Sequence, residues 1–256
     1  MHLYKNLCIF IAVMVIVTGC TKSGAYRPTD KFEINRENFL KNRQILEETY
    51  SIEMVTYCYK DIHVEYPKIQ GLKDKESEEK INNLIEDYIL LDIIRVDDLN
   101  HLNELNMELE CRITLQSQKL LSFYYVGESS IDGFKPYDQV YSMTLDIKDV
   151  KELKLDDFVD IDETLVEMIK KSTDVTNRGL ENNPNNEALR ESLLYQIQDR
   201  DTESYMEYLT NGWYGFVLEP DALVIEAGVA YYSGVYVLIR LPGRIDDNCF
   251  IFDEFQ

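Results

Sequence analysis

The chain has 256 residues, of which 45% are hydrophobic, with 18 tyrosines and a formal net charge of −21 at pH 7. This composition is typical of a folded globular protein and excludes a disordered tether. The acidic excess disfavours nucleic acid and anionic lipid head groups as partners and favours cationic ones, although the same charge also keeps a surface protein soluble.

The first 20 residues have the pattern of an export signal. Lys5 supplies a positive charge, residues 7–17 are almost entirely apolar, and Thr18-Gly19 precedes Cys20. A cysteine at this point resembles the lipobox of bacterial lipoproteins. The resemblance implies cleavage before Cys20, a diacylglycerol with palmitate-type acyl chains on its sulfur, and a mature chain at the outer face of the bacterial cytoplasmic membrane. A plain signal peptide and a transmembrane anchor are the alternatives, but the apolar run is too short to span a bilayer comfortably.

Three cysteines remain beyond the predicted signal and lipidation site, namely Cys58, Cys111 and Cys249. A disulfide between Cys58 and Cys111 requires their strands to be neighbours, and three free thiols are the alternative. The sequence contains no C-x-x-C spacing, so we expect no structural zinc site.

The predicted elements begin with a polar, lipid-anchored tether at 20–34 and a helix at 35–48. Residues 54–66 are rich in β-branched and aromatic side chains and predict a strand. Asp74 then caps an amphipathic helix whose apolar stripe recurs at helical spacing. That stripe consists of Ile81, Leu84, Ile85, Tyr88 and Ile89.

Hairpins dominate the middle of the chain. Residues 105–126 predict two strands joined by a turn at 116–119, and 127–138 predict a loop. The next strand places Tyr141, Met143, Leu145 and Ile147 on one face, and Asp162 caps a helix with Leu165, Val166 and Ile169 as its stripe.

The last third combines a polar segment, a long helix and more strands. Residues 177–186 predict a mobile loop, and 189–209 predict a helix that Asn211-Gly212 ends. Strands follow at 213–218, 223–227 and 231–241. Together these patterns predict an α+β domain at 35–256, built from antiparallel hairpins with inserted helices. It forms one domain or two subdomains, at about 54–130 and 131–256.

Three groups of segments resemble one family. They are Tyr66-Pro67-Lys68-Ile69-Gln70-Gly71-Leu72 with the helix around 81–85, the strand at 141–147 with Leu153-Lys154-Leu155-Asp156-Asp157-Phe158, and residues 216–242. This order is similar to the extracytoplasmic sensor domains of RsiV-type anti-sigma factors and to a module that precedes some peptidoglycan deacetylases. The resemblance implies an α+β binding module, which in one branch of the family binds lysozyme. The sigma-binding and deacetylase parts are absent from this sequence.

No catalytic or metal-binding motif stands out. His63 and His101 have no second histidine or cysteine at ligand spacing, and the acidic run at 156–163 lacks the pattern of an EF-hand loop. The G-x-S-x-G nucleophile pattern and Gly-rich phosphate loops are also absent. We therefore expect no metal, no cofactor and no catalytic residue that sequence alone identifies.

The candidate binding residues are aromatic side chains near the turns of the C-terminal strands. They are Trp213, Tyr214, Tyr231, Tyr232 and Tyr236. Aromatic faces stack on sugars or anchor a protein partner, whereas strand alternation directs about half of them into the core.

The favoured function is a non-catalytic, surface-anchored binding or sensor domain. Its partner is expected to be a cationic protein such as lysozyme, or cell-wall glycan. The alternatives are a cell-envelope enzyme that draws its acid and base from the 47 acidic residues, or a structural partner of an envelope complex.

Overall fold

The computed structural model describes residues 50–95, 99–131, 134–230, 235–246 and 249–253, all of which belong to the compact unit Ile45–Gln256. The predicted signal, Cys20, the tether and the helix at 35–48 lie outside these residues. Among the described helices, none combines the length and apolar character needed to cross a membrane.

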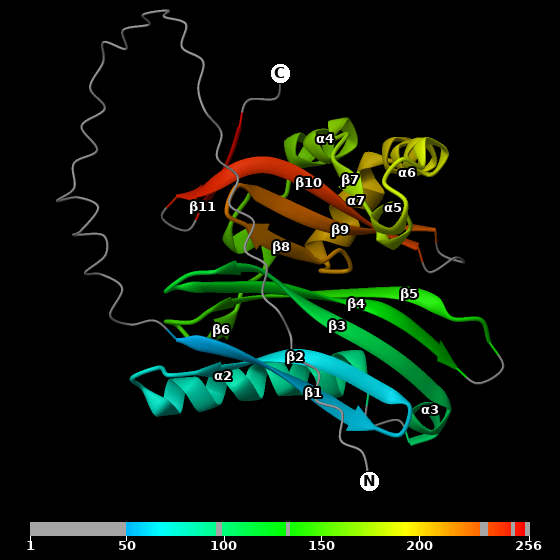
Figure 1. Cartoon of the computed structure of the whole chain (residues 1–256). Helices are drawn as coiled ribbons and strands as arrows, with labels where there is room; N and C mark the ends of the chain where they lie inside the picture. The colour runs from blue at the N-terminus through cyan, green and yellow to red at the C-terminus, as the bar shows by residue number, and fades with distance from the viewer. Residues whose placement is uncertain (1–49, 96–98, 132–133, 231–234, 247–248, 254–256) are drawn as a thin grey trace, which may run out of the picture. The chain divides into compact units, whose positions relative to one another are not determined.

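Two mostly antiparallel sheets form the framework and confirm the predicted α+β class (Figure 1). The first sheet contains, in spatial order, β1 (Ser51–Tyr59), β2 (Ile62–Gln70), β3 (Leu105–Gln116), β4 (Leu120–Ile131), β5 (Tyr137–Asp146) and β6 (Lys151–Glu152). The second contains β11 (Cys249–Phe252), β10 (Val235–Asp246), β9 (Ala222–Ala230) and β8 (Phe216–Glu219), with β7 (Val175–Thr176) paired to β10. Within the first sheet, β2 and β3 run parallel.

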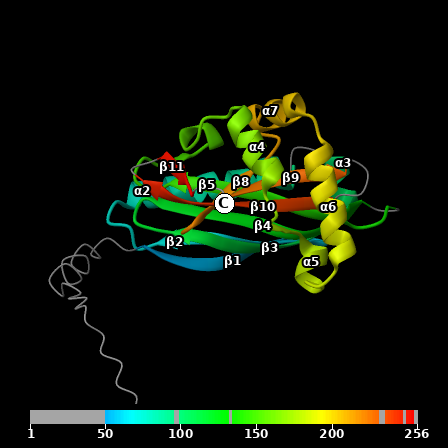
Figure 2. The ribbon, with the colours of Figure 1, turned by 90° about the horizontal axis from the view of Figure 1, so that it is seen from above.

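Helices cover the outer faces of the two sheets (Figures 1 and 2). On the first sheet lies α2 (Lys75–Asp87), which continues as the π-helical segment η2 (Tyr88–Ile93). On the second lie α4 (Glu163–Lys171), α6 (Glu187–Asp199) and α7 (Thr202–Thr210). The remaining short helices are α3 (Leu99–Glu104), η3 (Leu155–Asp157) and α5 (Arg178–Asn182).

Three hydrophobic clusters follow from this layering. Ile81 and Ile85 of α2 pack with Phe123 of β4, and a larger cluster joins the helices of the second sheet to β8, β9 and β10. A small third cluster lies between the sheets and contains Val126, Val140, Val217, Val224, Tyr236 and Leu238. Because side chains alternate along a strand, one face of β4 packs on α2 while the other meets the second sheet.

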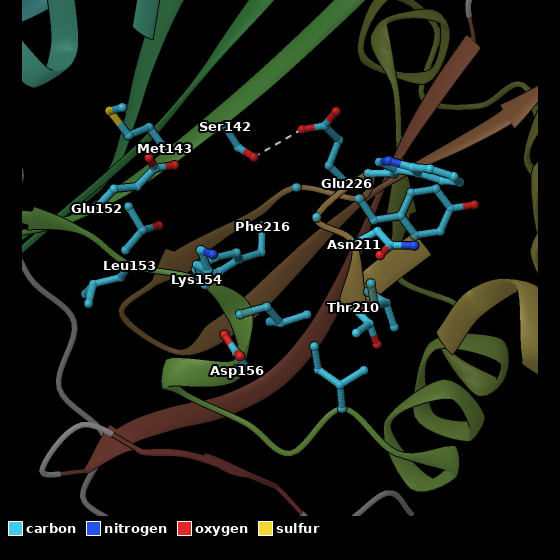
Figure 3. A pocket seen from close by; sticks show the side chains of 18 of the residues that line it. Ser142, Met143, Glu152, Leu153, Lys154, Asp156, Thr210, Asn211, Phe216 and Glu226 are labelled. Atoms are coloured by element: carbon cyan, nitrogen blue, oxygen red, sulfur yellow. Dashed lines mark hydrogen bonds between the residues drawn. The ribbon is translucent and has the colours of Figure 1, made fainter. Parts of the chain in front are cut away.

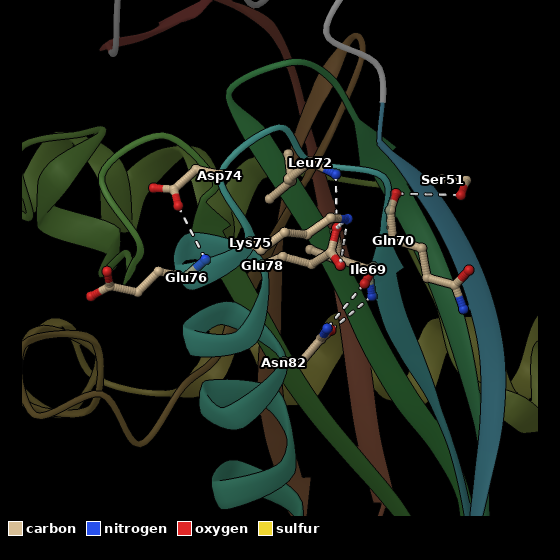
Figure 4. A network of polar contacts seen from close by, with 9 residues as sticks. All are labelled: Ser51, Ile69, Gln70, Leu72, Asp74, Lys75, Glu76, Glu78 and Asn82. Atoms are coloured by element: carbon tan, nitrogen blue, oxygen red, sulfur yellow. Dashed lines mark hydrogen bonds and ion pairs between the residues drawn. The ribbon is translucent and has the colours of Figure 1, made fainter.

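Asp74 caps α2 as predicted, since its side chain accepts a hydrogen bond from the Glu76 N–H at 3.1 Å (Figure 4). Asn82 fastens the same helix to β2, because its side-chain amide exchanges hydrogen bonds of 2.8 and 2.9 Å with the backbone of Ile69. The Glu78 carboxylate accepts the Leu72 N–H at 2.8 Å, which anchors the connection between strand and helix.

Two predictions in the first half were wrong. The single strand at 54–66 is a hairpin of β1 and β2, because Lys60 takes a left-handed conformation with φ of 53° and turns the chain. The loop at 127–138 is mostly strand, since β4 runs to Ile131 and β5 begins at Tyr137. Gly127 does not make a turn there. It permits close strand contact, because a Cβ at this position would lie 1.9 Å from the Glu108 carbonyl oxygen.

Two further predictions need correction. The segment at 177–186 contains α5, which Asn177 caps by accepting the Leu180 N–H at 2.9 Å. The helix at 189–209 is two helices, because Asp201 starts α7 by accepting the Ser204 N–H at 2.7 Å. Its end at Gly212, with φ of 69°, agrees with the prediction.

The cysteines do not meet the condition for a disulfide. Cys58 lies on β1 and Cys111 on β3, and β2 lies between these strands. Both are free thiols, as is Cys249. The boundary expected near residue 130 falls at the end of β4, which pairs with β5 in one sheet.

Candidate functional site

A pocket of about 450 Å³ lies where the two sheets meet (Figure 3). Its lining comes from β5 and β6 of the first sheet, β8 and β9 of the second, and the connection between α7 and β8. β6 pairs with only Leu145 and Asp146 of β5. The earlier part of that β5 edge, at Tyr141 to Thr144, borders the pocket.

Strand alternation places Glu226 in this pocket. Leu223, Ile225 and Ala227 of β9 pack toward the helices, whereas Val224 belongs to the cluster between the sheets. Glu226 shares the face of Val224 and therefore points toward the first sheet. Its Oε2 accepts a hydrogen bond from the Ser142 hydroxyl of β5 at 3.1 Å (Figure 3).

Gly215 makes this pairing sterically possible. A Cβ at residue 215 would lie 2.1 Å from Ser142 Oγ and 2.6 Å from Glu226 Oε2. Its carbonyl also accepts the Glu226 N–H at 2.9 Å, so the chain must approach closely here. Residue 215 must therefore be glycine, because a larger side chain would not fit beside Ser142 and Glu226.

Burial raises the pKa of Glu226 to about 8, and the hydrogen bond from Ser142 offsets part of that rise. No ion pair joins this carboxyl to a cation within the described part of the chain. Glu226 is therefore mostly protonated at pH 7 and can donate as well as accept a hydrogen bond.

Other charged groups lie along a second wall of the pocket, opposite Thr210 and Asn211 (Figure 3). They are Glu152, Lys154 and Asp156. Desolvation and the nearby Asp92 carboxylate raise the pKa of Glu152, and the Lys154 charge partly opposes this. With Glu226, the lining carries three carboxyl groups and one ammonium.

Aromatic side chains complete the site. Tyr88, the first residue of the π-helical segment η2, donates its hydroxyl to the Ser142 carbonyl at 3.2 Å. Such segments are frequent at functional sites because they re-aim a side chain out of the helical register. Trp213 is 64% exposed, and its ring packs 5.3 Å from that of Tyr208, measured between centroids. An exposed indole therefore borders a pocket whose inner wall carries a carboxyl group.

The five aromatic candidates have different locations. Trp213 and Tyr214 both line the pocket, but Tyr214 is buried and packs edge-to-face on Tyr205 and Tyr208. Tyr236 is buried between the sheets, which is the core location that strand alternation offered as the alternative to binding. Tyr231 and Tyr232 lie outside the described residues.

Sequence reasoning missed Glu226, Ser142 and Glu152. A usable signal was the single acidic residue inside the otherwise apolar strand Ala222–Ala230, because buried charged groups are rare. Nothing in the sequence indicated that Ser142, 84 residues away, is its partner.

His63 and the acidic run at 156–163 do not form a metal site in the described residues. His63 is exposed beside a shallow hollow, while Asp162 caps α4 and Asp157 accepts the Lys154 N–H. Over the described ranges there is no cluster of three or more His, Cys, Asp and Glu side chains suited to a metal ion.

Comparisons with known proteins give a distant structural likeness. No family model and no curated protein matches the sequence. A DUF3298 family member from Bacteroides fragilis matches with 14% identity and a TM-score of 0.42, over 77% of this chain and 90% of that one. A DUF3298 family protein from Pseudomonas aeruginosa matches with 13% identity and a TM-score of 0.45, over 77% and 92% respectively. The chain is thus distantly similar in structure to these two DUF3298 proteins. This likeness concerns the fold and says nothing about a ligand.

Proposed function

We propose that the chain is a non-catalytic binding module and that the pocket containing Glu226 and Trp213 is its binding site. The observation that carries the proposal is the exposed indole beside a concave site with a desolvated carboxyl group inside it. Ligand sites combine a concave surface with a few polar groups that fix orientation, and exposed aromatic anchors dominate binding energy.

The proposed location is the outer face of the bacterial cytoplasmic membrane. Support comes from the lipobox-like pattern before Cys20 and from the short apolar run that precedes it. A lipid on Cys20 would hold the module near the membrane, where a cationic protein such as lysozyme or the wall glycan can reach it. Mass spectrometry of the membrane-extracted chain tests this directly. The expected result is an N-terminal acylated Cys20, and a soluble chain that retains residues 1–19 would contradict it.

A binding experiment with a matched pair of variants tests the site. The chain without residues 1–20 keeps all three hydrophobic clusters, which lie inside the compact unit Ile45–Gln256. We expect it to bind lysozyme or soluble peptidoglycan fragments in calorimetry, and we expect Trp213→Ala to weaken that binding by about tenfold or more. Tyr195→Ala is the control, because Tyr195 is 66% exposed on α6, away from the pocket lining. The proposal would be contradicted if the chain bound neither lysozyme nor peptidoglycan fragments. Equal losses of affinity in Trp213→Ala and Tyr195→Ala would also contradict it.

The second candidate function is hydrolysis of wall polymers. Glu226 has the protonation state that a general acid needs at neutral pH, and Glu152 and Asp156 are two further carboxyls in the same pocket. An enzyme of this kind would release reducing ends from peptidoglycan, and Glu226→Gln would abolish the release. Peptidoglycan that remains intact with the purified chain would exclude this candidate.

A further inference from the structure

The pocket has an unbalanced set of charges. Glu152, Asp156 and Glu226 contribute three carboxyl groups to its lining, and Lys154 contributes the single ammonium. Asp92 adds a further carboxylate close enough to raise the pKa of Glu152. The lining therefore holds more acidic than basic groups, in keeping with the net charge of −21.

Lys154 does not neutralise Glu226. Its charge lowers the pKa of Glu152, whereas the causes acting on Glu226 are burial and the Ser142 hydroxyl. Ser142 supplies the one side-chain hydrogen bond that Glu226 makes within the described residues. A carboxylate has room for several donors, so Glu226 keeps acceptor capacity toward the pocket.

Aromatic side chains line part of the same pocket. Tyr88, Tyr141, Trp213, Tyr214 and Phe216 all contribute to the lining. Aromatic faces attract cations through the ring quadrupole, and the attraction strengthens where water is partly excluded. Carboxylates and aromatic rings around one small cavity are the chemistry that recognises an organic ammonium group.

We propose that the pocket binds an organic cation, an alkylammonium group, which pairs with Glu226 between Ser142 and Trp213. The inference rests on the proposed function and adds the chemical class of the ligand. A cavity of about 450 Å³ accommodates a free amine of a few carbons or the side chain of a lysine. The two sources share the alkylammonium group, and the experiment below separates them.

Binding of the cation must release a proton. As the ammonium enters, it keeps its own protons, and the Glu226 carboxyl loses its proton to solvent, so the pair forms as ammonium and carboxylate. The titratable groups that share the pocket with Glu226 are Tyr88, Tyr141, Glu152, Lys154, Asp156 and Tyr214. Burial raises the pKa of Tyr88 and Tyr141, so these two stay neutral through pH 8, and Glu152→Gln measures what the neighbouring carboxyl contributes.

The test is calorimetry of the chain without residues 1–20 against three five-carbon probes of different charge. These are cadaverine, 1,5-pentanediol and glutarate, and the peptide acetyl-Gly-Lys-Gly-amide provides the lysine source. We expect cadaverine or the peptide to bind and the neutral and anionic probes not to bind. Affinity should rise about tenfold from pH 6 to pH 7 and level off above pH 8, because the carboxylate form of Glu226 binds and its pKa lies near 8. Buffers of different ionisation enthalpy should report release of about one proton per bound amine below pH 7.

Glu226→Gln should weaken amine binding by about tenfold or more and remove its pH dependence, because the paired charge is lost. Glu191→Gln, on an exposed carboxyl of α6, should change neither property. Melting curves establish that Glu226→Gln is folded. If this variant does not fold, the proton release measured for the native chain is the observation that tests the inference.

The inference would be overturned if 1,5-pentanediol bound as tightly as cadaverine, or if an amine bound without proton release. So would failure of both amine probes, and in that case binding of lysozyme or peptidoglycan that still depends on Trp213 would leave the proposed function standing. Binding of the peptide without cadaverine supports the inference and assigns the ammonium to a protein lysine. Binding of cadaverine without the peptide supports it and assigns a free amine.

Discussion

Two serine hydroxyls join the sheets, and their surroundings differ sharply. Ser122 of β4 lies 2.7 Å from Thr144 Oγ1 and accepts the Leu218 N–H at 2.8 Å, and both Ser122 and Thr144 are fully buried. Ser142 of β5 donates to Glu226 at 3.1 Å on the wall of a pocket. The first contact is a closed hydrogen-bonded unit, and the second leaves a carboxyl with spare acceptor capacity.

This difference indicates which of the two contacts stabilises the fold and which belongs to a binding site. A fully satisfied buried network adds stability, whereas a desolvated carboxyl without a cationic partner lowers stability when it ionises. Proteins keep such groups where binding or chemistry uses them. We therefore expect changes at Ser122 to act on folding and changes at Ser142 and Trp213 to act on binding.

The largest expected effect is the pH dependence of stability that Glu226 causes. Its pKa rises from an unfolded value of 4.5 to about 8 on folding. The native state therefore holds this proton between those values, so the contribution of Glu226 to stability is fully present below pH 4.5 and is lost as pH rises toward 8. Relative to Glu226→Gln, the native chain should lose about 2.5 kcal/mol between pH 6 and pH 9. Urea unfolding at both pH values measures this, and parallel curves for the two proteins would contradict it.

Ser122→Ala should destabilise the fold by about 2 kcal/mol at any pH from 5 to 9, because it leaves the buried Leu218 N–H without its acceptor. Thr114→Val is the nearby control, because it removes only the hydrogen bond from the Thr114 hydroxyl to the Ser122 carbonyl and leaves the Ser122 hydroxyl in place. A loss below about 0.5 kcal/mol would show that this contact is no more structural than the one at Ser142.

Gly215→Ala should cost about 1 to 2 kcal/mol, because the new Cβ would lie 2.1 Å from Ser142 Oγ and force the Ser142–Glu226 pair apart. The control is Gly228→Ala, since a Cβ there would have nothing within 4 Å. Chemical denaturation of both variants provides the comparison, and equal stabilities would contradict the steric role of Gly215.

Ser142→Ala should change stability by less than about 1 kcal/mol, because Glu226 can take a water in place of the hydroxyl on the pocket side. It should nevertheless raise the pKa of Glu226 further, since the Ser142 hydrogen bond holds that pKa down. A downward shift in the Glu226 titration of this variant would contradict the assigned hydrogen bond.

Trp213→Ala should have the smallest effect on stability, within about 0.5 kcal/mol, because the indole is mostly exposed. A larger loss in thermal unfolding would mean that the ring is part of the packing around Tyr208 and not a binding surface. The binding loss expected above should therefore appear without a loss of fold.

Local sequence rules predicted much of the fold and little of the site. Asp74 and Asp162 cap helices as expected, because capping depends on a residue and its next few neighbours. The loop prediction at 127–138 was wrong, because Gly127 permits two strands to approach closely, and one sequence cannot distinguish that role from a turn. The pairing of Ser142 with Glu226 arises when two sheets pack, and no local pattern encodes that contact.

The most direct measurement is a ¹³C NMR titration of the Glu226 side-chain carboxyl in the chain without residues 1–20, assigned with Glu226→Gln. A midpoint near pH 8 is expected in the free protein. The midpoint should fall well below that value when cadaverine or the lysine peptide is bound, because the ammonium stabilises the carboxylate. A midpoint near the ordinary value of 4.5 in the free protein would contradict the desolvated pocket from which the binding site is inferred.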